Sequence, residues 1–156
     1  MIVLLRIDDR LIHAQVVIGW GRKLRPDRIL VADDEVSESD WEKELYLSAS
    51  PDIKVSIASV EEAWDMISGG VFDREKVLLL VKGPEEASRL IGKGLDLREV
   101  NVGGMHYAGG RQKVLDNVYL DPEERKILRE MVKQGITLEA RALPGDERVI
   151  LNSKIV

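Results

Sequence analysis

"MIVLLRIDDRLIHAQVVIGWGRKL" (residues 1–24) places an apolar strand, a polar loop and a helix in direct succession. The aliphatic run 2–7 is typical of a buried strand. Residues 14–25 follow with apolar side chains at helical spacing, and their two glycines suit a helix that packs closely on a sheet. The order strand, loop, helix predicts the start of an α/β sheet.

The same alternation continues along the chain. The sequence predicts further strands at 28–33, 53–59, 76–82 and 99–104, and further helices at 37–50, 59–70, 83–94 and 121–135. Shorter strands are predicted at 112–120, 136–143 and 148–152. We therefore expect one α/β domain over residues 1–156, with a mostly parallel open sheet, helices on both faces and antiparallel strands toward the C-terminus.

Composition excludes several classes of protein. The 156 residues contain no cysteine, so disulfides and thiolate metal sites are excluded. A formal net charge of −5 argues against non-specific binding to nucleic acid. The apolar runs are far shorter than the roughly 20 residues of a membrane span, and no signal peptide is recognisable, so we expect a cytoplasmic protein. The oligomeric state stays open, and a homo-oligomer is allowed; the aromatic residues Trp41, Tyr46 and Trp64 are expected in the core rather than at an interface.

The loop after the first strand is the main candidate site, because ligands of parallel sheets bind at the carboxyl ends of the strands. His13 directly precedes the predicted helix, where free backbone N–H groups attract anions. Arg10 offers a planar fork of donors, and Gln15 adds an amide. Asp8 or Asp9 could hold one imidazole nitrogen protonated and leave the other free to attack. These groups suit acceptance of a phosphoryl group on histidine, although the same spacing also fits a histidine that merely pairs with a carboxylate.

A second candidate is "NVGGMHYAGGR" (101–111), a glycine-rich segment after the fifth strand. Gly103 and Gly104 permit close approach of the backbone to a ligand, and His106 and Arg111 could line the same crevice. The alternative is a loop that only crosses the edge of the sheet. The segment matches neither nucleotide-binding glycine motif.

A metal site is a further alternative for these residues. It would combine His13 and His106 with Asp33 or Asp34, which all follow predicted strands. No local ligand spacing supports such a site.

Basic residues cluster early in the chain. Residues 1–28 contain six Lys or Arg against three Asp, whereas residues 29–50 contain one Lys against seven Asp or Glu. The basic residues of the first helix and its end could form a docking surface for an acidic partner: Arg22, Lys23, Arg25 and Arg28. The alternative is a solvated helix face.

Four segments together carry a resemblance to a known family: "RIDDRLIHAQVVIGW", "RILVADDEV", "VSIASVEEA" and "NVGGMHYAGGR". The chain resembles, over its whole length, the IIB component of the mannose/fructose/sorbose class of the bacterial sugar phosphotransferase system. The most specific element is the stretch from Asp8 to Val16 after the first strand.

The resemblance implies a cytoplasmic phosphocarrier that needs no metal or other cofactor. Such a protein accepts a phosphoryl group from a phosphohistidine on a IIA partner and passes it to a sugar bound by a membrane IIC/IID partner. The family's phosphorylated histidine corresponds to His13, its loop arginine to Arg10, and its acidic pair to Asp8 and Asp9. Any IIA donor is expected to be a separate protein.

This chain departs from the family at one position of the loop, where Ala14 replaces the usual glycine after the histidine. Alanine does not readily adopt a positive φ, but it is harmless if residue 14 is already helical. An alternative function is a regulatory or binding module of the same fold, which would sense the state of the phosphotransferase system without transporting a sugar.

Overall fold

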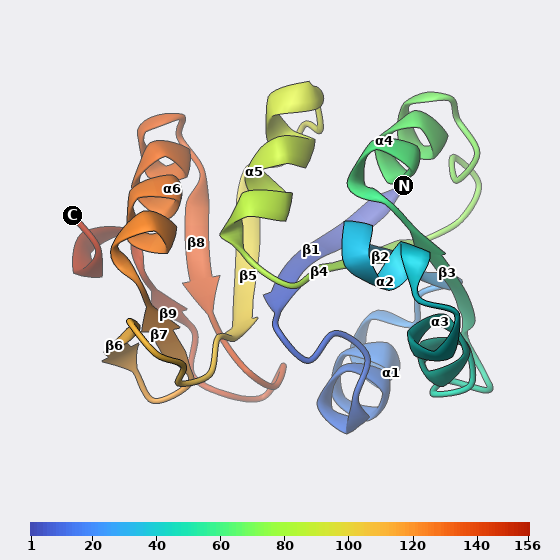
Figure 1. The fold of residues 1–156 in the computed structure, drawn as a ribbon, viewed down its shortest axis with the longest axis horizontal. Coiled ribbons are helices and arrows are strands. Elements are labelled where there is room, and N and C mark those ends of the chain that lie inside the picture. Colours follow the sequence, from blue (N-terminus) through green and yellow to red (C-terminus); the bar gives the residue numbers. More distant parts are fainter.

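The computed structural model describes residues 1–156, and seven strands form its main sheet. The strands are β1 (Ile2–Asp8), β2 (Arg28–Ala32), β3 (Lys54–Ala58), β4 (Val77–Val81), β5 (Glu99–Gly104), β8 (Thr137–Ala140) and β9 (Val149–Ile150). Their order across the sheet is β3-β2-β4-β1-β5-β8-β9 (Figure 1). All neighbours are parallel except β8 and β9, which are antiparallel, so the predicted sheet is confirmed.

Helices cover both faces of the sheet, as predicted. One face packs against α4 (Val60–Ser68), α5 (Pro84–Lys93) and α6 (Pro122–Lys133). The other face packs against η1 (Gln15–Trp20), α1 (Gly21–Leu24), α2 (Asp34–Glu38) and α3 (Asp40–Leu47). A short 3-10 turn, η2 (Asn152–Lys154), lies near the C-terminus.

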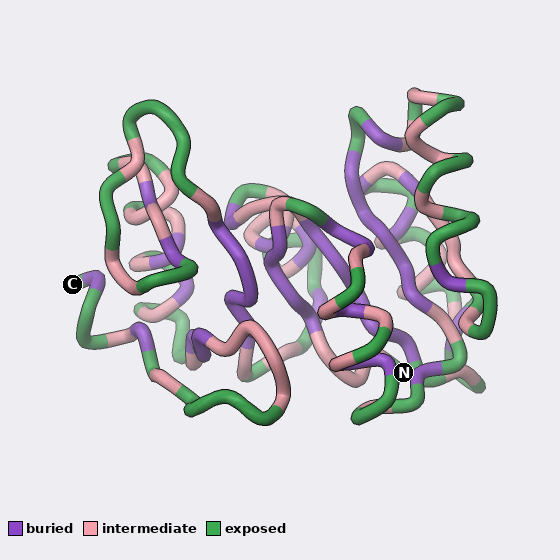
Figure 2. The backbone as a smooth tube through the Cα atoms, turned by 90° about the horizontal axis from the view of Figure 1, so that it is seen from below, coloured by how far each residue is buried: buried purple, intermediate pink, exposed green.

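The core lies along the central strands. Every residue of β4 is fully buried, because this strand has a neighbour on each side and helices on both faces. Side chains alternate along β1, where Leu5 and Ile7 join the cluster beneath α4 to α6 while Leu4 faces the opposite cluster. The backbone drawn by burial shows the same distribution, with buried segments in the middle of the molecule (Figure 2). This rigid centre supports the end of β1, where the main candidate loop begins.

Three predicted elements differ from the structure. The predicted helix 37–50 is two helices, because Ser39 has an extended backbone and its hydroxyl caps α3 by accepting a hydrogen bond from the Glu42 N–H. The predicted strand 112–120 is the hairpin of β6 (Gln112–Leu115) and β7 (Val118–Leu120), a separate two-stranded sheet. The predicted helix 14–25 begins as the π-helix η1 and continues as α1.

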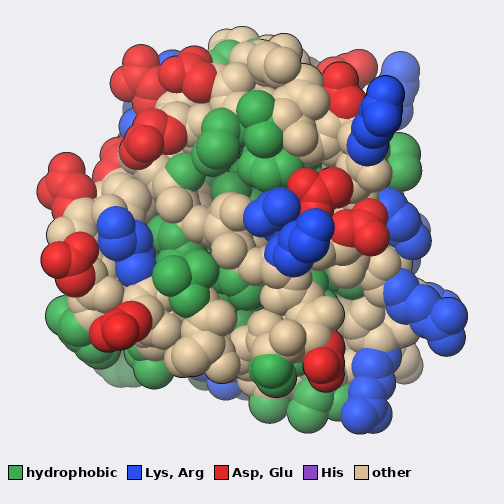
Figure 3. Space-filling model, turned by 90° about the vertical axis from the view of Figure 1, so that its right-hand side faces the viewer, with side chains coloured by type: hydrophobic (Ala, Val, Ile, Leu, Met, Phe, Trp, Pro, Cys, Tyr) green, Lys and Arg blue, Asp and Glu red, His purple; other side chains and the backbone are tan.

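The prediction for the aromatic residues is wrong for Trp41, which is 67% exposed on α3. Tyr46 and Trp64 are half-buried and pack against the two core clusters. The side of the molecule formed by β3, α3 and α4 exposes hydrophobic patches bordered by charged side chains (Figure 3). No helix is long and apolar enough to cross a membrane.

Candidate active site

The loop after β1 lies at the carboxyl edge of the sheet, between the ends of β4 and β5. Asp8 is the last residue of β1, and its carbonyl accepts a hydrogen bond from the Leu11 N–H at 3.0 Å. Leu11 is fully buried with a φ of 54°, so the chain turns sharply and anchors the loop by an apolar side chain. Residues 12–14 then lead into η1, with Ala14 as its N-cap residue.

Asp8 and His13 form the centre of the site. The Nε2 atom of His13 lies 2.7 Å from Oδ2 of Asp8. The Asp8 side chain is fully buried, whereas that of His13 is 16% exposed. An ionised carboxylate only accepts hydrogen bonds, so the proton of a neutral His13 ring resides on Nε2 and Nδ1 carries the lone pair. In this tautomer Nδ1 is the ring nitrogen without a proton.

Further donors keep Asp8 ionised although it is buried. Burial raises the pKa of Asp8, but the hydrogen bond from His13, the charge of Arg6 and the hydrogen bond from the Arg10 N–H lower it more, so the net shift of the pKa is downward. Arg6 Nη2 donates to Oδ2 at 3.0 Å, and the backbone N–H of Arg10 donates to Oδ1 at 3.0 Å. The carboxylate therefore remains available as an acceptor for His13.

Arg10 and Gln15 lie at the surface beside this pair. The Arg10 side chain is 48% exposed, and its Nη2 donates to Oε1 of Gln15 at 3.1 Å. Its Nε lies 3.9 Å from Oδ1 of Asp8, so most of its donors face solvent. The guanidinium is thus free to bind an anion at the loop.

Ala14 has helical backbone angles, with φ −53° and ψ −42°. The carbonyl of His13 accepts hydrogen bonds from the N–H groups of Val16 and Val17, both at 3.0 Å. His13 therefore lies at the first turn of the helical segment 15–24. Alanine fits position 14 without strain, which confirms the harmless reading of this departure from the family pattern.

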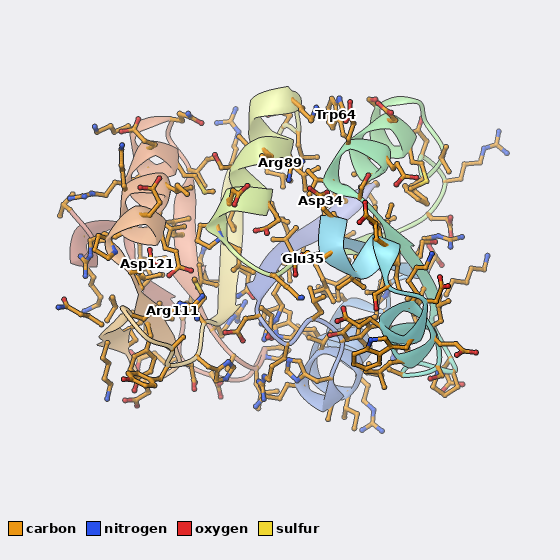
Figure 4. The ribbon with its side chains drawn as sticks, in the orientation of Figure 1. Asp34, Glu35, Trp64, Arg89, Arg111 and Asp121 are labelled. Atoms are coloured by element: carbon orange, nitrogen blue, oxygen red, sulfur yellow. The ribbon has the colours of Figure 1, made fainter.

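Asp9 belongs to a second cluster and not to the His13 pair. Its Oδ1 lies 2.6 Å from Nδ1 of His106, and its Oδ2 accepts a hydrogen bond from the His106 N–H at 2.8 Å. Arg111 donates to the His106 carbonyl at 2.7 Å and to Glu124 of α6 at 2.7 and 2.9 Å. Figure 4 labels Arg111 beside Asp121, the cap of α6. The second loop is thus tied to the first loop and to α6.

The two glycines of β5 have steric roles close to Asp8. A side chain at Gly103 would overlap the guanidinium of Arg6. A Cβ atom at Gly104 would lie 3.1 Å from Cε1 of His106 and 3.2 Å from Oδ1 of Asp8. The glycine-rich segment therefore makes room for protein side chains at these two positions, and not only for a ligand.

The residues of the metal alternative do not form a cluster. Asp33 caps α2 by accepting a hydrogen bond from the Val36 N–H, and Asp34 pairs with Arg89 of α5 at 2.8 Å (Figure 4). No group of three or more His, Asp or Glu side chains is arranged to hold a metal ion. The proposed combination with His13 and His106 is therefore wrong.

The four predicted docking residues do not share one environment. Arg22, Lys23 and Arg25 are exposed near the end of α1, which runs back from the carboxyl edge of the sheet. Arg28 is half-buried at the start of β2, where its guanidinium donates to Glu75 at 3.1 Å and to Ser56 at 2.7 Å. A docking role stays a prediction for Arg22, Lys23 and Arg25. Arg28 is held by these two contacts at the amino edge of the sheet, opposite to the edge that carries His13.

The sequence interpretation did not single out Arg6, which donates a hydrogen bond to Asp8, nor Asn101 and Trp20, which both contact Arg6. The signal was present, since Arg6 is a charged residue inside an otherwise aliphatic strand. A buried charge in such a strand requires partners. One partner, Asp8, lies two residues along the same strand, but Asn101 and the Arg141 carbonyl are 95 and 135 residues away, so the sequence could not identify them.

Comparisons with known proteins show what the chain is similar to. The family described as "PTS system sorbose subfamily IIB component" matches residues 2–155. The sorbose-specific EIIB component of Lacticaseibacillus casei is 33% identical over 156 residues, which cover 99% of this chain and 95% of that protein.

Two further comparisons concern domain architecture and structure. The mannose-specific EIIAB component of Escherichia coli (strain K12) is 32% identical over 150 residues, which cover 96% of this chain but only 46% of that protein. The crystal structure of the IIBSor domain of the sorbose permease from Klebsiella pneumoniae superimposes with a TM-score of 0.93 and 31% identity, and covers 99% of this chain and 96% of that one.

Proposed function

Because this chain belongs to the sorbose-subfamily IIB components of the phosphotransferase system, we propose that it is a cytoplasmic phosphocarrier that accepts a phosphoryl group on His13. The donor is a phosphohistidine on a IIA partner, and the final acceptor is a sugar bound by a membrane IIC/IID partner. The EIIAB name of the Escherichia coli relative supports a IIA donor, since that name joins the two components in one protein.

One contact carries the proposal, the 2.7 Å hydrogen bond between Nε2 of His13 and Asp8. It leaves Nδ1 as the atom that attacks phosphorus. The phosphorus–nitrogen bond of the donor breaks as the bond to Nδ1 forms, and the ring keeps its proton on Nε2, hydrogen-bonded to the Asp8 carboxylate. The positive charge that the phosphorylated ring gains is offset by the adjacent carboxylate.

Arg10 is the group that we assign to the phosphoryl oxygens. Its exposed guanidinium lies at the same loop, and phosphoryl transfer depends mostly on positioning and on stabilisation of charge. Gln15 holds that guanidinium through the 3.1 Å hydrogen bond. Asp9 has a different role here, since it ties the loop to His106.

Phosphoryl uptake from phosphoenolpyruvate tests the proposal. The assay contains the general phosphotransferase proteins and a mannose-class IIA, and it follows acid-labile, base-stable label on the wild type and on His13→Ala. His106→Ala is the matched variant, because it removes the other of the two histidines of the chain. We expect label on the wild type and on His106→Ala, and none on His13→Ala.

Label on His13→Ala would contradict the assignment of the acceptor. Absence of label from every variant, with a IIA partner that phosphorylates another IIB, would contradict carrier function and favour the regulatory or binding module.

A further inference from the structure

Arg6 is a fully buried arginine in the middle of β1, with 0% of its side chain exposed. Its Nη2 donates to Oδ2 of Asp8 at 3.0 Å, and its Nη1 donates to Oδ1 of Asn101 at 2.7 Å. Nη1 also donates to the carbonyl of Arg141 at 3.1 Å. The guanidinium thus joins β1, β5 and the segment that follows β8.

The space around this guanidinium is shaped by residues from other elements. Gly103 of β5 leaves open the position that the Arg6 side chain occupies. The Trp20 ring of η1 covers it, with Cζ of Arg6 5.5 Å from the ring centroid. The indole N–H of Trp20 donates to the Ala142 carbonyl at 2.8 Å, which fixes the ring in place. The same contacts therefore anchor the helix that directly follows His13.

Stability alone is a weak reason for such an arrangement. A buried ion pair often contributes no more to stability than apolar residues of the same volume, because both charges lose their hydration. The arrangement does fix the orientation and the ionised form of the Asp8 carboxylate. Its Oδ2 accepts from Arg6 and from His13, and its Oδ1 accepts from the Arg10 N–H, so the carboxylate is held on both oxygens.

We infer that Arg6 is a positioning residue of the active site, which orients the Asp8 carboxylate and offsets its charge so that the His13 ring keeps one proton on Nε2 and none on Nδ1. This inference rests on the proposed function for its consequence, the reactivity of Nδ1. The other part of the inference, which of the two ring nitrogens of His13 carries a proton, does not depend on a IIA partner.

The reason is electrostatic. Without Arg6, the buried charge of Asp8 keeps the Arg10 N–H and the half-exposed Arg10 guanidinium 3.9 Å away but loses its one fully buried cation, and the carboxylate then favours a positively charged imidazolium as its neighbour. An imidazolium carries a proton on both nitrogens, so Nδ1 has no lone pair for attack on phosphorus. Loss of Arg6 is therefore expected to stop phosphoryl acceptance although neither His13 nor Arg10 is changed.

The test is NMR of the ring nitrogens of His13 in the isolated, 15N-labelled protein near pH 7. In the wild type we expect a protonated Nε2 and an unprotonated Nδ1. In Arg6→Met we expect a proton on both nitrogens, and a rate of phosphoryl uptake at least about 100-fold lower, as when the orientation or protonation of a catalytic histidine is disturbed.

Arg28→Met is the matched control, because Arg28 is also paired with a carboxylate and lies over an aromatic ring, with Cζ 5.4 Å from the Phe72 centroid. It is expected to leave the His13 ring as in the wild type. If Arg6→Met does not fold, Asn101→Leu removes the 2.7 Å acceptor of Arg6 and keeps all charges. We expect it to weaken the Nε2–H signal and to slow uptake about tenfold.

A folded Arg6→Met, or in its place a folded Asn101→Leu, with an unchanged His13 ring and an unchanged uptake rate would overturn the inference. A wild type that takes up no phosphoryl group, together with an altered ring in Arg6→Met, would refute the proposed function and leave the role of Arg6 on the ring intact. The two failures are therefore distinguishable.

Discussion

Gly103 and Arg6 share one space, because the position that a Cβ atom on Gly103 would occupy is filled by the guanidinium of Arg6. Glycine at this position of β5 is thus required by a side chain of the neighbouring strand. The pair couples the glycine-rich segment to the loop that carries His13, since the same guanidinium holds Asp8.

Gly103→Ala is expected to lower the free energy of unfolding by about 2–5 kcal/mol, because the methyl group displaces a buried, ion-paired arginine. Urea denaturation measures the change. Gly109→Ala is the control, since a Cβ atom there meets nothing within 4 Å, and its effect should stay within about 0.5 kcal/mol. Equal stabilities of the two variants would show that the guanidinium can move aside without loss.

Asp8 should make the protein sensitive to acid. Burial raises the pKa of Asp8, but the hydrogen bond from His13 and the charge of Arg6 outweigh it, so the pKa lies below its ordinary value. A lowered pKa in the folded state contributes stability that is present above about pH 4, the value for an unfolded chain, and is lost as the pH falls through the folded pKa.

The comparison of the wild type with Asp8→Asn isolates this contribution. Unfolding free energies at a series of pH values below 5 should fall more steeply for the wild type. Asp34 and Glu99, whose pKa values are also lowered, are present in both proteins, so their effects cancel. Parallel pH profiles would mean that Asp8 is not stabilised as a carboxylate in the folded protein.

Ala14→Gly tests the departure from the family pattern. Residue 14 has helical angles, so glycine there should lower the free energy of unfolding by about 0.5–1 kcal/mol. The rate of phosphoryl uptake should not rise, because alanine already fits the loop. A faster variant would indicate that the reacting loop adopts a backbone conformation that alanine resists.

The sequence allowed the fold to be predicted well, because buried parallel strands and capped helices are local patterns. The strand 76–82 and the helix 83–94, for example, correspond to β4 and α5 within two residues at each end. The interruption at Ser39 was missed, since a serine at that spacing fits both the interior and the start of a helix. Asp8, Arg10, His13 and Gln15 are close in the sequence, from the end of β1 to the start of η1, so it was predictable that they lie near one another.

Other parts of the site depend on contacts between distant segments. The assignment of Asp9 to His106 joins residues 97 positions apart, and that of Arg6 to Asn101 joins residues 95 apart. No local pattern encodes which of two adjacent aspartates faces His13. In the assembled sheet Asp8 is paired with Gly104 of β5, whereas Asp9 reaches His106 two residues further on.

Arg10→Met should affect transfer more than stability. The Arg10 side chain is 48% exposed and makes one hydrogen bond, to Gln15. The free energy of unfolding should therefore change by no more than about 0.5 kcal/mol. Uptake should fall about 100- to 1,000-fold, as when a donor to a developing oxyanion is removed. Lys126→Met on α6 removes the same charge at an exposed position and should leave the rate unchanged; a similar loss in both variants would point to net charge as the cause.

The basic end of α1 is expected to speed the encounter with an acidic IIA partner. Arg22, Lys23 and Arg25 are exposed, and charges of this kind act mainly on the association rate over roughly the 10 Å that 0.1 M salt allows. Replacing all three by glutamine should lower the second-order rate of transfer from phosphorylated IIA at low salt and have little effect at high salt. Arg28→Gln should instead lower stability, because it breaks the contacts with Glu75 and Ser56. If the triple variant matches the wild type at low salt, these residues form only a solvated helix face, and the partner docks elsewhere around His13.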